Sequence, residues 1–174
     1  MRFVKDGKSG KLIDINALEY ATVIISFAAS YHYWVTEKNC IHRKIPFPKV
    51  LISADNVASE FWAKKGCKRS MAGRRLGRLQ CAMMINNPVG LTTDHIDTHS
   101  NIVADKISRW DSQSDVLPGF AKLKQEFPQL KNCRRFHPSK ELLSLISDVL
   151  LLERLVNPLE IMEVLRDHPG RIAS

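Results

Sequence analysis

Three carboxylates fall at points of the sequence where core elements would hold them. Glu19 lies early in an apolar stretch, Asp55 follows a short apolar run, and Asp105 lies inside a later amphipathic stretch. Cleavage of a phosphodiester by two metal ions needs several carboxylates that converge from different elements, because Mg²⁺ and Mn²⁺ prefer hard oxygen ligands. Each acid taken alone is more often a solvated or capping residue. The elements that carry them therefore decide their meaning.

Helices and strands are expected to alternate around these acids. Residues 15–34 have the length and apolar density of a buried helix. Residues 49–54 form an apolar run behind a proline, which favours a buried strand, with the start of a helix as the alternative. Further helices are expected over 56–65, 70–86 and 101–110, and a second strand over 89–97. This order predicts an α/β layer over residues 1–110.

The remaining residues, 111–174, are expected to form an all-helical extension. After a polar linker, helical apolar spacing recurs over 117–127, 138–155 and 158–166, each begun or ended near a proline. The tail has an apolar face made of Leu142, Leu143, Ile146, Leu150, Leu151 and Leu155. Packing against the α/β layer explains such a face most simply, and an interaction with a partner protein is the alternative.

Three blocks around the acids resemble the ribonuclease H domain of reverse-transcribing retrotransposons. They are INALEY at 15–20, LISADNVAS at 51–59 and HIDTHSNIVADKISR at 95–109, and they occur in the order that the family shows. The last block is the most specific, because six of its residues match in register: His95, Asn101, Ala104, Asp105, Ser108 and Arg109. Residues 134–148 also resemble sequence found downstream of this domain in some elements.

The resemblance implies a ribonuclease H-like α/β fold that cleaves RNA within an RNA–DNA hybrid with two magnesium ions. Glu19, Asp55 and Asp105 would be the second, third and fourth of four catalytic and metal-binding carboxylates. Asn56 and Asn101 would be structural, with Asn101 capping the final helix.

The first carboxylate is where the sequence departs from the family. In the family it lies on an opening strand well before the helix glutamate, whereas 18 residues precede Glu19 here. Asp6 and Asp14 are the acids upstream, and neither lies on an equivalent strand. We therefore expect a truncated layer that keeps at most residual strands at 2–4 and 11–13. An exposed sheet edge and little or no hydrolysis should follow.

One stretch carries much of the positive charge of this basic chain, whose formal net charge is +8. No acidic residue occurs between Phe61 and Thr93, and seven cations do: Lys64, Lys65, Lys68, Arg69, Arg74, Arg75 and Arg78. Arg74 and Arg78 would share one helical face, with Arg75 at its border, and could follow a phosphate backbone. In the family, the corresponding region lies beside the substrate groove. An ordinary solvated cationic face is the alternative.

Other candidate residues favour plainer roles. His95 could shuttle a proton near a metal site, but a satisfied structural histidine is the better interpretation, and His99 has no assigned role. Trp62 is expected in the core. The cysteines are scattered without zinc-site spacing. Neither an apolar run of about 18 residues nor a secretory signal is seen, so an intracellular protein, cytoplasmic or nuclear, is expected.

The sequence thus predicts a retroelement-derived, ribonuclease H-like fragment that binds nucleic acid, with RNA–DNA hybrid as the expected polymer, and cleaves it poorly. Mg²⁺ or Mn²⁺ would bind only if the carboxylate site is functional. One alternative is a metal-dependent hybrid endonuclease whose sheet is completed by another chain. A second alternative is a helical protein-interaction module.

Overall fold

The chain folds as a mixed α/β structure in which helices predominate. The computed structural model describes residues 3–5, 12–36, 49–86, 89–108, 116–134, 136–151, 154–167 and 170–172. Its strands are β1 (Phe3–Lys5), β2 (Leu12–Asp14), β3 (Lys49–Ala54), β4 (Gly90–His95), β5 (Phe136–Pro138) and β6 (Gly170–Ile172). Its helices are α1 (Ile15–Thr36), α3 (Val57–Lys65), α4 (Met71–Asn86), α5 (Ile102–Ser108), α6 (Val116–Glu126), the 3-10 turn η1 (Pro128–Leu130), α7 (Lys140–Leu151) and α8 (Pro158–Asp167). No helix in this part of the chain is long and apolar enough to span a membrane.

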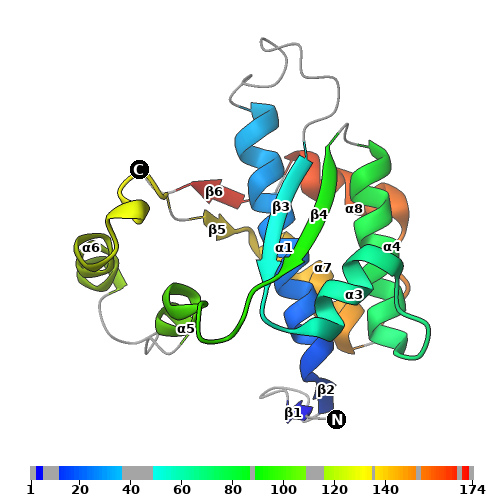
Figure 1. The fold of residues 1–174 in the computed structure, drawn as a ribbon. Coiled ribbons are helices and arrows are strands. Elements are labelled where there is room, and N and C mark those ends of the chain that lie inside the picture. Colours follow the sequence, from blue (N-terminus) through cyan, green and yellow to red (C-terminus); the bar gives the residue numbers. More distant parts are fainter. Residues whose placement is uncertain are drawn as a thin grey trace.

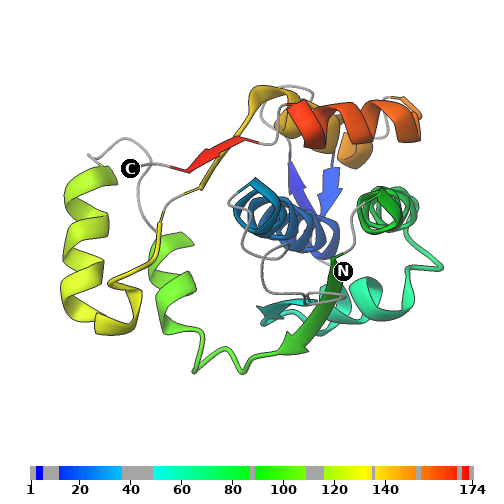
Figure 2. The ribbon, with the colours of Figure 1, turned by 90° about the horizontal axis from the view of Figure 1, so that it is seen from above.

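Three layers lie behind one another in the body of the molecule. β3 and β4 form a parallel two-stranded sheet, in register from Lys49 opposite Gly90 to Ala54 opposite His95. α1 lies behind this sheet, and α7 and α8 lie behind α1, as Figure 1 shows from the front and Figure 2 from above. α3 and α4 connect the two strands along one side. The expected alternation of helices and strands between residues 15 and 108 is confirmed.

α1 is buried on more than one side, which explains its high apolar content. Its buried hydrophobic side chains are Ala17, Tyr20, Ala21, Val23, Ile24, Phe27 and Ala28. Because β3, α3, α4 and α7 all contact it, the helix needs no wide polar face. Asp14 begins the helix, since its Oδ1 accepts a hydrogen bond of 3.1 Å from the backbone N–H of Asn16. The helix predicted from residue 15 is confirmed and ends at Thr36.

The two helices after β3 begin and end where the sequence predicts. Asn56 caps α3, because its side chain accepts hydrogen bonds of 2.8 and 3.0 Å from two backbone N–H groups of the first turn. Gly66 ends α3 with a φ of 78°, a left-handed backbone that glycine adopts without strain. The Ser70 hydroxyl accepts from the N–H of Gly73 at 3.1 Å and caps α4. Capping depends on a few neighbouring residues, so local sequence suffices to predict it.

The sheet has an uncovered face and, within the described residues, an open edge. β3 pairs there with β4 alone, whereas parallel strands usually have both faces covered. Val50 is buried in the core, but the next residue, Leu51, is 62% exposed. On β4, the buried Thr93 donates a hydrogen bond of 3.3 Å to the carbonyl of Glu60 in α3. The exposed edge and apolar surface expected from the sequence are thus present in the part of the chain that is described.

The carboxy-terminal region is not all-helical, which corrects the prediction made for residues 111–174. β5 and β6 pair antiparallel, with Pro138 opposite Gly170. Gly170 has a φ of 129°, and a Cβ there would lie 2.3 Å from the carbonyl oxygen of His137, so glycine is required. Each strand is three residues long, which is too short to show the alternation by which strands are recognised. Pairing between distant segments forms them instead.

α7 and α8 pack into the same core as α1 and α4. Their buried hydrophobic side chains are Leu142, Leu145, Ile146, Val149, Ile161 and Leu165. The Ser139 side chain caps α7 and the Asn157 side chain caps α8, each through a hydrogen bond of 3.0 Å to a backbone N–H. Packing therefore accounts for the buried part of the tail's apolar face. Two members of that face, Leu143 and Leu155, are exposed.

α5 and α6 lie to one side of the three layers in both views (Figures 1 and 2). An ion pair between Lys106 and Glu126 joins them. The Lys106 ammonium also lies 5.1 Å from the centre of the Phe127 ring. Helices were expected over 101–110 and 117–127, and both are confirmed in their described parts. Asp105 is thus carried by an element beside the core.

One buried chain of hydrogen bonds joins α1, α3 and α4. The Tyr20 side chain is 1% exposed, and its hydroxyl donates to Gln80 Oε1 at 2.6 Å. Gln80 Nε2 donates in turn to the carbonyl of Ala63 at 2.9 Å. Trp62 packs edge to face on Tyr20, with ring centroids 6.2 Å apart, in agreement with its expected core role. Burial raises the pKa of Tyr20, so its hydroxyl remains a proton donor.

Replacing Tyr20 with Phe should destabilise the fold while leaving its packing nearly unchanged. The variant leaves Gln80 Oε1 buried without a donor, which costs about 1–3 kcal/mol. The free energy of unfolding can be measured by urea titration. Thr22→Val is a matched control, because the exposed Thr22 hydroxyl donates to the carbonyl of Leu18 on the same helix. Equal losses in both variants would contradict a special role for the buried chain.

Candidate functional site

Glu19 and Asp55 come together where the first turns of α1 pass the carboxyl end of β3. Glu19 is half-buried on α1, and Asp55 is exposed directly after β3. Their proximity is evident from electrostatics, since the negative charge of Asp55 raises the pKa of Glu19. The first two blocks of the predicted site, INALEY and LISADNVAS, therefore meet in space.

Burial is the larger cause of the raised pKa of Glu19, whose ordinary value is 4.5. The charge of Asp55 adds to it, and a hydrogen bond with the Asn56 side chain acts in the opposite direction. The Oε2 atom of Glu19 is buried and has no hydrogen-bond partner among the described residues. An ionised carboxylate is costly in such a place, and a bound proton or cation would relieve the cost.

Three asparagine side chains organise the surroundings of the two acids. Asn56 Nδ2 donates to Asn16 Oδ1 at 2.9 Å and joins the start of α3 to α1. Asn101 Nδ2 donates to Asp55 Oδ2 at 3.1 Å and joins the start of α5 to the end of β3. Asn101 was expected to cap α5, yet its described side-chain bond goes to Asp55. Sequence reasoning gave Asn16 no role, although it belongs to the INALEY block that could have indicated one.

Asp105 lies on the helix that begins beside Asp55. It lies in α5, one turn after Asn101, and its backbone N–H donates to the Asn101 carbonyl at 3.0 Å. The side chains that shift the pKa of Glu19 are those of Asp55 and Asn56, and Asp105 is not among them. Within the described residues, no three His, Cys, Asp or Glu side chains gather in a way that could hold a metal ion. The structure thus brings together Glu19 and Asp55 of the predicted trio.

A centre of two Mg²⁺ or Mn²⁺ ions needs more carboxylates than the Glu19–Asp55 pair supplies. Such a centre holds its ions about 3.5–4 Å apart and needs carboxylates that bridge or flank them. Each Mg²⁺ also demands near-octahedral oxygen coordination, which carboxylates and water supply together. The Glu19–Asp55 pair can attract a cation and accept hydrogen bonds.

The two histidines near the end of β4 are both exposed. His95 was expected to be a satisfied structural residue, and this is corrected: within the described part of the chain its side chain makes no hydrogen bond. Its backbone N–H donates to Asp94 Oδ1 at 2.9 Å. The His99 N–H donates to Asp97 Oδ2 at 3.2 Å, so His99 takes part in a turn through its backbone alone. The match of His95 to the family string did not predict that its side chain is exposed.

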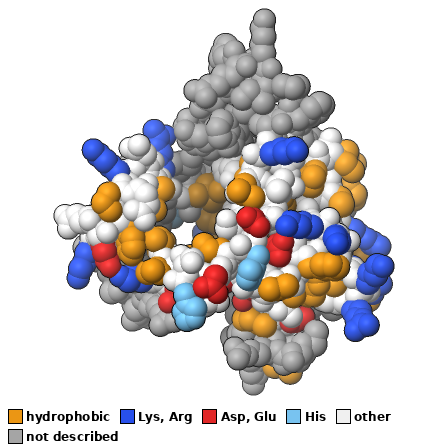
Figure 3. Space-filling view, viewed as in Figure 1, with side chains coloured by type: hydrophobic (Ala, Val, Ile, Leu, Met, Phe, Trp, Pro, Cys, Tyr) orange, Lys and Arg blue, Asp and Glu red, His pale blue; other side chains and the backbone are white. Residues whose placement is uncertain are grey.

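The seven cations of the basic segment divide over three places. Four line a hollow beside α4: Lys64, Lys65, Arg74 and Arg78. Two are exposed in the loop between α3 and α4: Lys68 and Arg69. Arg75 differs, because its Nη1 donates to the carbonyl of Arg154 at 3.0 Å and fixes the chain before α8. Figure 3 shows Lys and Arg side chains gathered over α3 and α4, with hydrophobic side chains among them.

The hollow beside α4 has a volume of about 1150 Å³. α3 and β4 bound it on one side, and the first residues of α8 bound it on the other. Its apolar lining consists of Tyr20, Trp62, Ala63, Ala82, Met84, Ile85, Leu91, Pro158 and Met162. Gly77 and Cys81 of α4 also line it. We call this feature the α4 hollow. It combines an apolar surface with four cations.

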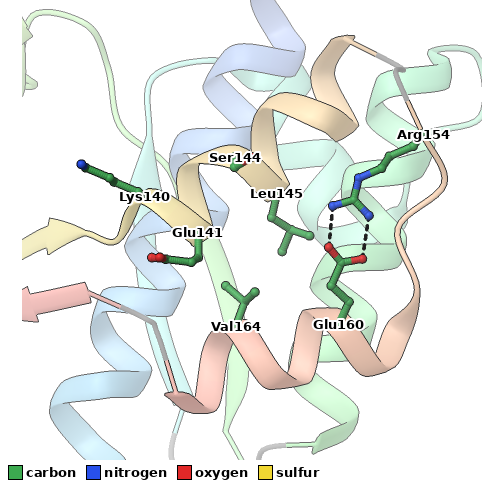
Figure 4. Close-up of a pocket in the computed structure, with 7 residues that line it drawn as sticks. All are labelled: Lys140, Glu141, Ser144, Leu145, Arg154, Glu160 and Val164. Atoms are coloured by element: carbon green, nitrogen blue, oxygen red, sulfur yellow. Dashed lines mark hydrogen bonds and ion pairs between the residues drawn. The ribbon is translucent and has the colours of Figure 1, made fainter.

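A second, smaller cavity lies between α7 and α8 and has a structural explanation. Its volume is about 400 Å³, and Figure 4 shows Arg154 and Glu160 facing each other on one side of it. The Arg154 guanidinium donates to both carboxylate oxygens of Glu160 and to Asp148. These bonds lower the pKa of Glu160. Because the charges satisfy one another, this cluster fixes the connection between the helices and leaves little for a ligand.

The raised pKa of Glu19 predicts how the stability of the fold depends on pH. A folded-state pKa above the unfolded value means that the protonated form is favoured on folding, so this stability is present below about 4.5 and is lost as pH rises through the folded pKa. Glu19→Gln should therefore be more stable than the natural chain at pH 7, and the difference should shrink at pH 4–5. Denaturant titrations at both pH values measure it.

Asp55→Asn is the companion variant, because it removes the charge that adds to this effect. The pH dependence assigned to Glu19 should become smaller but should not vanish, since burial is the larger cause. A gap between Glu19→Gln and the natural chain that is constant from pH 4 to pH 7 would show that Glu19 does not titrate in a buried setting.

The meeting of INALEY, LISADNVAS and the start of α5 is the central observation of this region. The evidence for this meeting is the charge interaction between Glu19 and Asp55 and the hydrogen bond from Asn101 to Asp55. No family model, no curated protein and no solved structure matches the chain. A functional proposal must therefore rest on these residues and on the α4 hollow.

Proposed function

We propose that this chain is a retroelement-derived, ribonuclease H-like protein that binds nucleic acid, preferably RNA–DNA hybrid, and is impaired in cleaving it. The observation that carries the proposal is the meeting of three separate sequence blocks at Asp55. Asp55 lies within the charge field of Glu19 and accepts a hydrogen bond from Asn101. The sequences of these three blocks are the ones that resemble the family.

The order of the elements supports the same proposal. A helix with Glu19 is followed by a strand that ends before Asp55, by two helices, by a parallel strand and by a helix with Asp105. This is the order expected of the later part of a ribonuclease H-like layer. Sites in such sheets form at the carboxyl ends of parallel strands, and Asp55 lies at that end of β3.

The acids that the described residues bring together support the proposal of impaired cleavage. Glu19 and Asp55 are coupled, while a two-ion centre needs further ligands in the same place. The buried, unpartnered Oε2 of Glu19 is a position where a cation would be favourable. The carboxylates can therefore keep affinity for Mg²⁺ or Mn²⁺ without supplying the geometry that aligns two ions.

Binding of nucleic acid is attributed to the cations on and around α3 and α4. Lys68 and Arg69 are exposed in the loop between the two helices, where phosphates can reach them without entering the α4 hollow. Each phosphate contact releases counterions and makes the affinity depend on salt. Arg75 contributes less than expected, because the Arg154 carbonyl holds its guanidinium.

The binding prediction can be tested with a labelled RNA–DNA hybrid at several salt concentrations. Affinity should fall as salt rises, and Arg69→Glu should lower the slope of log affinity against log salt by about one. Lys131→Glu makes the same kind of charge reversal at an exposed site outside the basic segment. Equal effects of both variants would reduce the interaction to net charge and overturn the assignment of this surface.

A cleavage assay with Mg²⁺ or Mn²⁺ tests the second part of the proposal. Binding without cleavage is the expected result. Cleavage that is lost in Asp55→Asn would contradict impairment, and would favour a complete endonuclease whose remaining ligands come from another chain. The open edge of β3 is the place where such a chain could add a strand.

A further inference from the structure

The α4 hollow has a lining of one charge sign. Its nineteen lining residues include four cations and no acidic residue, although the chain has 18 acids in total. Lys64 is paired with Glu60 on the preceding turn, and the Lys65 ammonium lies 5.4 Å from the centre of the Phe61 ring. Arg78 has no hydrogen bond or ion pair within the described residues. A ligand of this hollow should therefore be acidic.

The hollow also has an apolar surface, which a simple anion would leave uncovered. Ile85 is 82% exposed and Met162 is 37% exposed, and both line it. An apolar partner that covers these side chains removes their surface from water, which is favourable. Methionines such as Met84 and Met162 adapt to the shape of an apolar partner. The ligand must bring apolar surface together with its negative charge.

The lining follows α4 for three turns. Arg74, Arg78 and Ile85 recur at helical spacing on the outward side of α4, and Gly77 lies beside them. Arg74 and Ile85 are eleven residues apart, so the stretch between them covers about 16 Å along the helix axis. The volume of about 1150 Å³ exceeds that of most pockets for small molecules. An extended ligand with an apolar stripe fits this shape better than a compact one.

Gly77 makes the hollow open at its middle. A Cβ at Gly77 would meet only Tyr20 Oη, at an ordinary distance of 3.7 Å. A Cβ at Gly73, in contrast, would lie 2.8 Å from Cys67 Sγ, so that glycine is required for packing. The fold thus has room for a Cβ at Gly77, while the hollow is wider without one.

We infer that the α4 hollow docks an acidic amphipathic helix of a partner protein. Apolar side chains at successive turns of that helix would cover Ile85, Met84 and Met162, and its carboxylates would face Arg74 and Arg78. This mode places a helix in an apolar groove through anchors at positions i, i+3 or i+4, and i+7. The inference goes beyond the proposed binding of nucleic acid and does not depend on it.

A nucleic acid strand fits the hollow less well than such a helix. Bound single strands stack their bases on exposed aromatic faces. Tyr20 is 1% exposed, and the half-buried Trp62 packs edge to face on it. A phosphate backbone would satisfy the cations and leave Ile85 and Met162 in water. Because four cations are shared, a docked helix should also weaken binding of nucleic acid to this surface.

Two synthetic peptides of about 16 residues, long enough to cover about 24 Å as a helix, provide the test. Both have the same composition of Glu and Leu with helix-favouring residues. One places Leu along a single face, and the other distributes the same residues without a face. The measurement is fluorescence anisotropy of each labelled peptide with the full chain. The amphipathic peptide should bind about tenfold more tightly or better, because apolar anchors supply most of the affinity.

Two variants locate the binding. Gly77→Leu fills the hollow without changing charge and should weaken binding of the amphipathic peptide about tenfold or more, without lowering the thermal stability. Arg78→Glu should weaken it as well. Lys131→Glu, the matched control, lies outside the hollow and should leave the affinity nearly unchanged.

Three results would overturn the inference. Equal binding of the two peptides would show attraction to any polyanion. Binding that is unaffected by Gly77→Leu would place the peptide elsewhere. Binding of a single-stranded oligonucleotide that Gly77→Leu weakens, with no binding of the amphipathic peptide, would assign the hollow to nucleic acid. The salt dependence of hybrid binding in Arg69→Glu is measured separately, so failure of the two proposals can be distinguished.

Discussion

The burial of α1 is the constraint on which the rest of the structure depends. β3, α3, α4 and α7 all contact this helix, so the sheet on one side and the carboxy-terminal helices on the other share one core. Covering a helix on opposite sides stabilises the fold through removal of apolar surface from water. It also places many of the described side chains of α1 close to another element. Glu19, one residue before the buried Tyr20, is partly buried, and this burial is the largest cause of its raised pKa.

The elements that could be predicted from the sequence are those decided by neighbours in the chain. α3 and α4 begin at Asn56 and Ser70, and α3 ends at Gly66, because capping hydrogen bonds and a left-handed glycine are local features. β5 and β6 could not be predicted, since three-residue strands exist through their pairing with each other. The placement of Arg75 shows the same limit. Its position on α4 is local information, but the Arg154 carbonyl that holds it is 79 residues away.

The candidate site could also be predicted only in part. The blocks around Glu19 and Asp55 indicated that these acids would meet, and the charge interaction between them agrees. The asparagine bonds that organise the region, from Asn56 to Asn16 and from Asn101 to Asp55, depend on how α1, β3 and α5 approach one another. No spacing in the sequence specifies those approaches. Asp105 is an example. The sequence predicts that it lies on a helix, but it does not predict that this helix, α5, lies with α6 beside the core (Figure 2).

α4 shows how one helix can serve the core and a surface at once. Leu76, Leu79 and Met83 are buried on its inner side, and the buried Gln80 joins it to α1 and α3. With these contacts satisfied, the outer side is free of structural demands, yet it carries Arg78 and the exposed Ile85 rather than a mixture of both charge signs. Cations without acids repel one another, and an exposed isoleucine gains nothing in water. Both costs would disappear if an acidic partner with an apolar stripe covered these side chains, as inferred for the α4 hollow.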